Sequence, residues 1–197
     1  MQSARNVWMF SLLAASAMAQ TPPPARTSGA QPPLPTLQLS SPAWQDGGPM
    51  PLKYTQAGHD VSPQLSWSHA PPGTESFVIM VHDMDAATSK GDEFWLSWLV
   101  WNIPKTSTSL PEGMPEGGNL ADGMRQISDS GPYYRGPVGP HSDPPHHFVF
   151  EIYALSATLN VPPVMGQSAV AVRTAIQEAM QGKVLAKGVL VGTFQRP

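Results

Sequence analysis

The sequence contains no cysteine, and charged residues make up only 13% of its 197 residues. Without cysteine the chain has no disulfide, no thiolate nucleophile and no zinc–thiolate site, so its stability must come from packing. The net charge of -3 and the lack of a basic stripe argue against a nucleic-acid partner, because such proteins neutralise a phosphate backbone with lysine and arginine. Small or weakly charged ligands are therefore expected.

Long hydrophobic runs are also missing, apart from a short one near the N-terminus. Residues 1–19 combine one basic residue, an apolar run over residues 7–18, and small residues at Ala17 and Ala19, a pattern typical of a secretory signal peptide. The apolar run is shorter than the roughly 20 residues that span a bilayer. We therefore expect cleavage before Gln20, no transmembrane segment after cleavage, and an exported protein that is periplasmic or secreted.

Proline and glycine are abundant, with 23 and 17 residues, and this favours turns and short strands over long helices. Residues 20–36 read QTPPPARTSGAQPPLPT and are predicted to be a proline-rich, disordered or polyproline linker. Folding is expected to begin near Leu37. Residues 37–197 are long enough for one domain with a hydrophobic core of its own.

Most of this domain has the pattern of strands separated by turns, which predicts an antiparallel sheet. The expected strands lie at residues 37–44, 65–67, 76–82, 148–155 and 184–194. Residues 104–141 contain seven glycines with little periodicity and are predicted to be loop. Residues 168–180 have apolar positions three and four apart, which predicts a helix with Ser168 as N-cap and Gly182 as C-cap.

Residues 94–101, FWLSWLVW, carry three tryptophans spaced every third residue. The segment is short, ends at Pro104 and has no fitting helix cap, so a strand is favoured over a helix. In a regular strand one face would hold Phe94, Leu96, Trp98 and Val100, and the other Trp95, Ser97, Leu99 and Trp101. Both faces are nearly all apolar, which predicts a strand buried between two layers of a sandwich.

Polar side chains that could carry function gather at two places. Asp83 and Asp85 follow the buried strand at residues 76–82, and three histidines lie between residues 141 and 147. A metal site is disfavoured, because adjacent histidines on a strand point to opposite faces and the three lack helical spacing. A hydrolase using Asp83, Ser97 and His146 stays open as an alternative, although the sequence has no G-x-S-x-G motif.

These segments together resemble the phosphatidylethanolamine-binding protein (PEBP) family, in its bacterial Raf-kinase-inhibitor-like branch. Asp83–Ala86 and Trp95–Pro104 (WLSWLVWNIP) are similar to the first family signature. Gly136–Pro140, His146–Phe148 and Tyr153–Leu155 are similar to the second. With SPQLSW, APPGTESF and GKVLAKGVLVGTFQR, the resemblance covers nearly the whole domain.

The resemblance implies a mostly β fold: an antiparallel β-sandwich with one or two short C-terminal helices and a small pocket at one end. By position, the ligand-binding residues expected in or beside the pocket are Asp83, Asp85, Trp95, Ser97, Pro140 and His146. Asp85 is expected to order the loop. A histidine N–H held by a carboxylate, together with backbone N–H groups, can donate to phosphate oxygens.

Three positions depart from the family pattern. Ser97 stands where the family has a second pocket histidine, Phe148 replaces a tyrosine, and Met84 replaces a proline. The resemblance predicts a non-catalytic protein that binds small anions such as phosphate or phosphoethanolamine head groups. Together with the signal-like N-terminus and the histidine spacing, we expect an exported protein with no cofactor and no metal. Two alternatives remain: a protein-interaction module that regulates an extracytoplasmic protease, and the weak hydrolase.

Overall fold

The computed structural model describes residues 33–87, 94–139, 144–163 and 168–197. The predicted signal peptide and most of the predicted linker lie outside these residues. Within the described residues no helix is long and apolar enough to cross a membrane.

Residues 33–197 form one compact unit of two β-sheets and one α-helix. The larger sheet has the strand order β2-β9-β8-β4-β5-β7, with strands at Gly48–Pro49, Val184–Phe194, His146–Leu155, Ser76–Ala87, Phe94–Pro104 and Arg125–Ile127. The smaller sheet has the order β1-β3-β6, with strands at Gln38–Ser40, Leu65–Ser68 and Ser109–Leu110. Two 3₁₀ turns, η1 at Leu52–Tyr54 and η2 at Ala121–Gly123, and the helix α1 at Ala169–Met180 complete the unit. The predicted mostly β sandwich is confirmed, and the described residues contain a single α-helix, which lies near the C-terminus.

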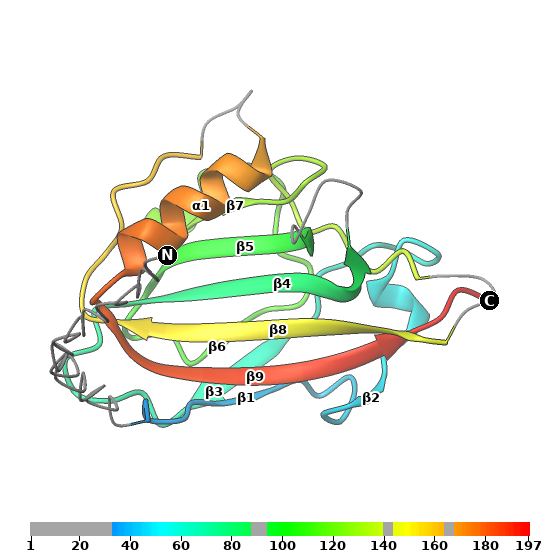
Figure 1. Cartoon of the computed structure of the whole chain (residues 1–197), viewed down its shortest axis with the longest axis horizontal. Helices are drawn as coiled ribbons and strands as arrows, with labels where there is room; N and C mark the ends of the chain where they lie inside the picture. Colours follow the sequence, from blue (N-terminus) through cyan, green and yellow to red (C-terminus); the bar gives the residue numbers. More distant parts are fainter. Residues whose placement is uncertain (1–32, 88–93, 140–143, 164–167) are drawn as a thin grey trace, which may run out of the picture. The chain divides into compact units, whose positions relative to one another are not determined.

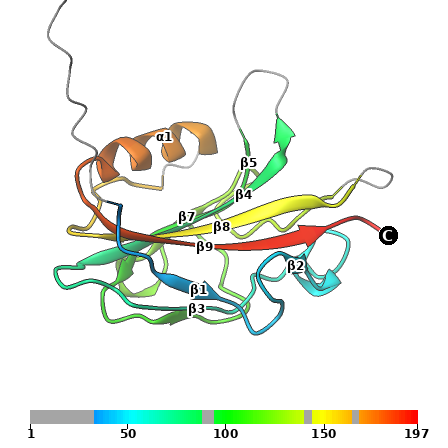
Figure 2. The same ribbon diagram turned by 60° about the horizontal axis from the view of Figure 1, so that its bottom comes forward.

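The large sheet is covered on both faces (Figure 1). Figure 2 shows α1 on one side of this sheet and the strands β1 and β3 on the other. Along β4, Phe77, Ile79 and Val81 pack against the small sheet, whereas Val78 and Met80 pack toward the helix. This period of two is what a strand buried on both faces requires.

The helix α1 begins and ends where its sequence predicts. The side chain of Ser168 accepts a hydrogen bond from the backbone N–H of Ala171, and Gly182 follows the last turn. Val172, Ile176 and Met180 are buried at spacings of four residues. Burial of this stripe against the large sheet is what stabilises a helix of only three turns.

The three tryptophans of β5 lie in three different environments. Trp101 is buried on the helix side, Trp98 is buried between the two sheets, and Trp95 is 40% exposed. The regular alternation expected for this segment fails, because Val81 pairs with Trp98 while His82 pairs with Leu96. Ser97 is therefore an extra residue, a β-bulge that puts Leu96 and Trp98 on opposite faces although they are two residues apart.

The segment predicted as loop, residues 104–141, contains β6, η2 and β7. The strand β7 was not predicted, because its three residues show no apolar periodicity. Its position depends instead on one buried polar side chain, that of Gln126. The amide of Gln126 donates to the carbonyls of Pro115 and Gly117 and accepts from the indole N–H of Trp98 at 2.9 Å. These bonds satisfy a buried amide and attach β7 to the edge of β5.

Contacts with the domain begin shortly before Leu37. The backbone N–H of Lys187 donates to the carbonyl of Pro35, and Thr36 forms a parallel bridge with Lys187. The last residues of the predicted linker therefore lie against β9.

Candidate functional site

A pocket of about 410 Å³ lies where the inner faces of β4 and β8 end. On β8 the alternation that buries Phe150 and Phe148 continues to His146, and on β4 the alternation that buries Val81 continues to Asp83. The pocket is lined by Asp83, Ala86, Trp95, Val138, Gly139, His146 and Phe148. Its volume is within the range of small-molecule sites, about 300–1,000 Å³.

Asp83 and His146 meet at this pocket although they are 63 residues apart in the sequence. The Nδ1 atom of His146 lies 2.8 Å from Oδ2 of Asp83. The other carboxylate oxygen, Oδ1, accepts the backbone N–H groups of Asp85 at 2.9 Å and Ala86 at 3.2 Å. With its side chain only 8% exposed, Asp83 is a buried carboxylate held by three donors.

This bond decides which ring nitrogen of His146 remains available to a ligand. A carboxylate only accepts hydrogen bonds, so the Nδ1–H of His146 donates to Asp83. In the described structure no hydrogen bond engages Nε2 of His146, and the side chain is 24% exposed. Protonated imidazole donates from Nε2, and neutral imidazole accepts there from a ligand hydroxyl.

A second carboxylate–imidazole pair lies next to the first. Oδ2 of Asp85 accepts the backbone N–H of His147 at 2.6 Å and contacts the Nδ1 of that residue at 2.9 Å. The pKa of Asp85 lies below its ordinary value, chiefly because of the backbone bond from His147; burial opposes this shift, and the His147 ring adds to it. Asp85 does not line the pocket; it joins the end of β4 to the start of β8.

The walls of the pocket are mostly apolar. Phe148 is buried, its ring centroid 6.5 Å from that of His146, and Trp95 forms an exposed rim. Gly139 has φ +60°, and a Cβ at this position would lie 2.7 Å from a ring carbon of Phe194. Glycine is therefore required where the backbone passes the pocket. The described lining contains no lysine or arginine, so Asp83 and His146 are its only ionisable groups.

A half-buried ion pair and a buried tyrosine hold the backbone that leads to Val138 and Gly139. Both oxygens of Asp60 are engaged, one by the Arg135 guanidinium at 2.8 Å and the other by the Gly136 backbone N–H at 2.6 Å. The hydroxyl of Tyr134 donates to the carbonyl of Tyr54 at 2.8 Å, and burial raises the pKa of Tyr134. Sequence reasoning missed Asp60, because nothing in its neighbourhood marks it as a partner of residues 75 positions away.

Ser97 is not among the described residues that line the pocket. Its side chain is fully buried at the bulge of β5, and its Oγ has no hydrogen-bond partner among the described residues. A serine nucleophile needs a base that takes its proton and access to substrate, and Ser97 has neither in this part of the chain. The geometry therefore gives no support to the hydrolase alternative.

Pro140 and His141 lie outside the described residues. Among the residues that the structure does describe, no group of three or more histidine, aspartate or glutamate side chains could hold a metal ion. Of the six predicted site residues, Asp83, Trp95 and His146 line the pocket.

The sequence and the fold were compared with known proteins. The family profile described as phosphatidylethanolamine-binding protein matches residues 40–195. A UPF0098 protein of Methanothermobacter thermautotrophicus is 36% identical over 162 residues, 81% of this chain and 99% of the relative. The protein named lipoprotein LppC of Mycobacterium tuberculosis is 34% identical over 179 residues, 88% of this chain and 81% of the relative.

Two solved structures have the same fold. The PEBP homolog CT736 of Chlamydia trachomatis superposes with a TM-score of 0.67 at 30% identity, over 82% of this chain and 99% of that chain. YbcL of E. coli, a member of the mammalian PEBP family, gives a TM-score of 0.68 at 27% identity, over 81% of this chain and 98% of that chain. The chain belongs to the phosphatidylethanolamine-binding protein family, whose fold it shares over about four fifths of its length.

Proposed function

We propose that this protein binds a small anionic ligand, a phosphate or a phospholipid head group, in the pocket of Asp83, Trp95 and His146, and catalyses no reaction there. The observation that carries the proposal is the Asp83–His146 pair, which lies at the pocket surface with Nε2 of the imidazole available. A ligand oxygen bound to Nε2 would lie in a site walled by Phe148 and Trp95. These rings lower the local dielectric constant on one side of the ligand and so strengthen a charge-assisted hydrogen bond.

The charge of the pocket favours a particular kind of anion. Because the described lining has no lysine or arginine, a multiply charged anion would be only partly neutralised by His146. Asp83 would repel such a ligand, but it can accept from an ammonium or hydroxyl group. We therefore expect a zwitterionic head group such as phosphoethanolamine to bind more tightly than inorganic phosphate.

Isothermal titration with two matched variants tests this function. Phosphoethanolamine and inorganic phosphate are titrated into wild type, His146→Ala and His147→Ala. His147 is the control because it neighbours His146 in sequence but bonds to Asp85 and does not line the pocket. We expect binding heats in wild type and His147→Ala and at least a tenfold loss of affinity in His146→Ala. Equal heats in all three proteins, or none in wild type, would remove the proposal.

We also propose that the protein works after export, in the periplasm or outside the cell. The apolar run and small residues within residues 1–19 support this location, and a relative carrying the name lipoprotein is consistent with it. Cell fractionation with N-terminal sequencing tests it. A mature protein that begins at Gln20 in an extracytoplasmic fraction is expected, and a cytoplasmic protein that retains residues 1–19 would exclude export.

A further inference from the structure

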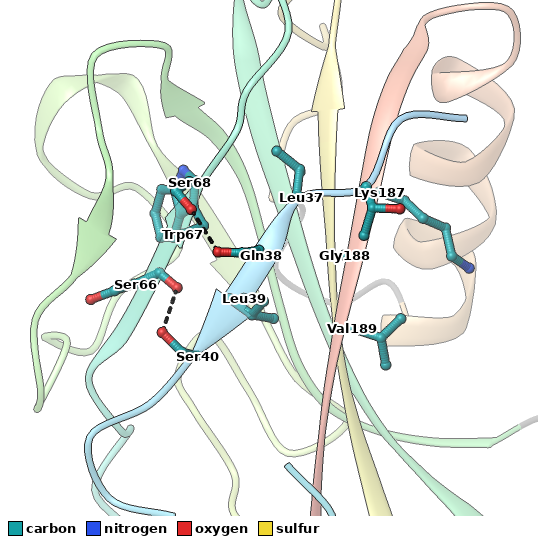
Figure 3. Close-up of a pocket in the computed structure, with 11 residues that line it drawn as sticks. Leu37, Gln38, Leu39, Ser40, Ser66, Trp67, Ser68, Lys187, Gly188 and Val189 are labelled. Atoms are coloured by element: carbon teal, nitrogen blue, oxygen red, sulfur yellow. Dashed lines mark hydrogen bonds between the residues drawn. The ribbon is translucent and has the colours of Figure 1, made fainter. Parts of the chain in front are cut away.

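A groove of about 710 Å³ lies between β1 and β9, and it shares no lining residue with the Asp83–His146 pocket (Figure 3). It is lined by residues 36–40, which include β1, by residues 66–68 of β3 and by residues 187–189 of β9. At one end the residue before β1 is bonded to β9, since the N–H of Leu37 donates to the carbonyl of Lys187 at 2.9 Å. Beyond this point β1 pairs with β3 and forms no ladder with β9.

The edge of β9 is closed on both sides of this groove and open within it. The N–H of Lys187 donates to Pro35, and Val191 donates to Asp46 and accepts from Gly47. Alternate residues of an antiparallel edge strand point their N–H and C=O groups outward. Val189 lies midway between these two residues, and no hydrogen bond to its outward backbone groups occurs in the described structure.

Such an edge is complementary to an extended polypeptide. The outward N–H and C=O groups of Val189 can both bond to a single residue of an added strand, whose C=O accepts and whose N–H donates. Because Lys187 and Val191 are already bonded, the open stretch of β9 covers residues 188–190, about 10 Å at roughly 3.3 Å per residue, which is room for about three residues of strand. A compact ligand would leave one of the two groups unpaired.

The lining of the groove limits the chemistry of the peptide. Leu37, Leu39 and Trp67 supply an apolar wall, and the indole Nε1 of Trp67 is a buried donor without a partner among the described residues. Serine hydroxyls at positions 40, 66 and 68 form a polar margin, as Figure 3 shows. The one charged residue in the described lining is Lys187, whose ammonium is paired with the carboxylate of Glu151 at 3.4 Å, so the groove favours an uncharged peptide.

We propose that the groove between β1 and β9 binds an uncharged, extended peptide segment, which adds about three residues of strand at Val189. This makes the protein a two-site molecule, with a head-group pocket at one place and a peptide site at another. The peptide site depends on backbone groups, so its occupant is recognised by extended conformation and charge more than by a fixed sequence.

The test uses a phage-displayed library of seven-residue peptides selected on the mature wild-type protein. Enriched peptides are synthesised with and without an N-methyl group on the central amide, which removes one backbone donor. The protein variants are Val189→Pro, which removes the outward N–H without breaking a ladder bond, and Val189→Thr, which keeps it. Near-ultraviolet circular dichroism verifies that each variant is folded.

We expect uncharged peptides that shift the amide resonance of Val189 and the indole resonance of Trp67. Their affinity should fall at least tenfold on N-methylation and in Val189→Pro, and stay within twofold in Val189→Thr. If Val189→Pro does not fold, the methylated peptides decide alone. An absence of enriched peptides, affinity that survives N-methylation, or shifts at the Asp83–His146 pocket instead would overturn the proposal. So would a dimer of this chain that occludes Val189.

Discussion

Replacing Asp83 by asparagine is the sharpest perturbation of the site, because it changes charge and hydrogen-bonding capacity but hardly changes size. The carboxylate accepts from His146 and from the backbone N–H groups of Asp85 and Ala86, and its side chain is only 8% exposed. The amide oxygen of asparagine can still accept the backbone N–H groups of Asp85 and Ala86. Its NH₂ group then faces Nδ1 of His146, which must give up its proton and become an acceptor.

The free-energy cost follows from these three bonds. Hydrogen bonds to charged groups contribute about 1.5–3 kcal/mol each and neutral ones about 0.5–1.5 kcal/mol, so Asp83→Asn weakens three bonds without abolishing them. We expect the free energy of unfolding to fall by about 2–3 kcal/mol. This value is lower than the sum over three fully buried bonds, because water reaches part of the site and weakens each charged bond. The proton of His146 should move from Nδ1 to Nε2.

Urea denaturation measures the first effect and ¹⁵N resonances of the histidine ring measure the second. Asp85→Asn is the matched control, since its carboxylate also accepts from a histidine but is 42% exposed and outside the pocket. We expect this control to lose no more than about 1 kcal/mol. If Asp83→Asn is no less stable than Asp85→Asn, or if the His146 proton stays on Nδ1, the reasoning about the pair is refuted.

Three further predictions concern the surroundings of the site and the strand edge. Ser97→Ala removes a buried hydroxyl without a described partner, so urea denaturation should show a gain of about 1 kcal/mol, and a loss would reveal a hidden bond. Gly188→Ala puts a Cβ 2.4 Å from the Leu37 carbonyl oxygen and should cost about 1–3 kcal/mol, which an unchanged midpoint would contradict. Burial lowers the pKa of His82; the Arg173 charge adds to this shift, and the Glu151 and Asp83 charges oppose it. As the pH falls below 6.5, His82 therefore binds a proton more readily in the unfolded chain than in the folded one. Stability should therefore decrease from pH 7.5 to 5.5, and less so in His82→Gln; equal slopes would exclude His82 as the cause.

Much of the fold could be predicted from the sequence because its strands and helix are periodic. The buried strand at residues 76–82 and the helix after Ser168 appear where apolar spacing and capping indicate them. The failure came at Ser97, because a bulge breaks alternation and leaves no mark in the sequence of a single strand. The strand β7 was missed because its position depends on Gln126, whose partners are distant carbonyls.

The site was predictable where the resemblance to a family assigned positions, and less so elsewhere. Asp83 and His146 were expected at one pocket, and the structure brings them within hydrogen-bonding distance. The role of Asp60 in holding the backbone before Gly139 could not be predicted, since it depends on tertiary contacts alone. The open backbone of Val189 was invisible for the same reason: a sequence does not tell which strand lies at an edge.

Titration of phosphoethanolamine into protein labelled with ¹⁵N in its histidine rings tests the central claim most directly. The ligand should shift Nε2 of His146 in a saturable way and leave both nitrogens of His147 unchanged, because only His146 lines the pocket. An unchanged His146, or a response shared equally by His147, would contradict a head-group site built on the Asp83–His146 pair.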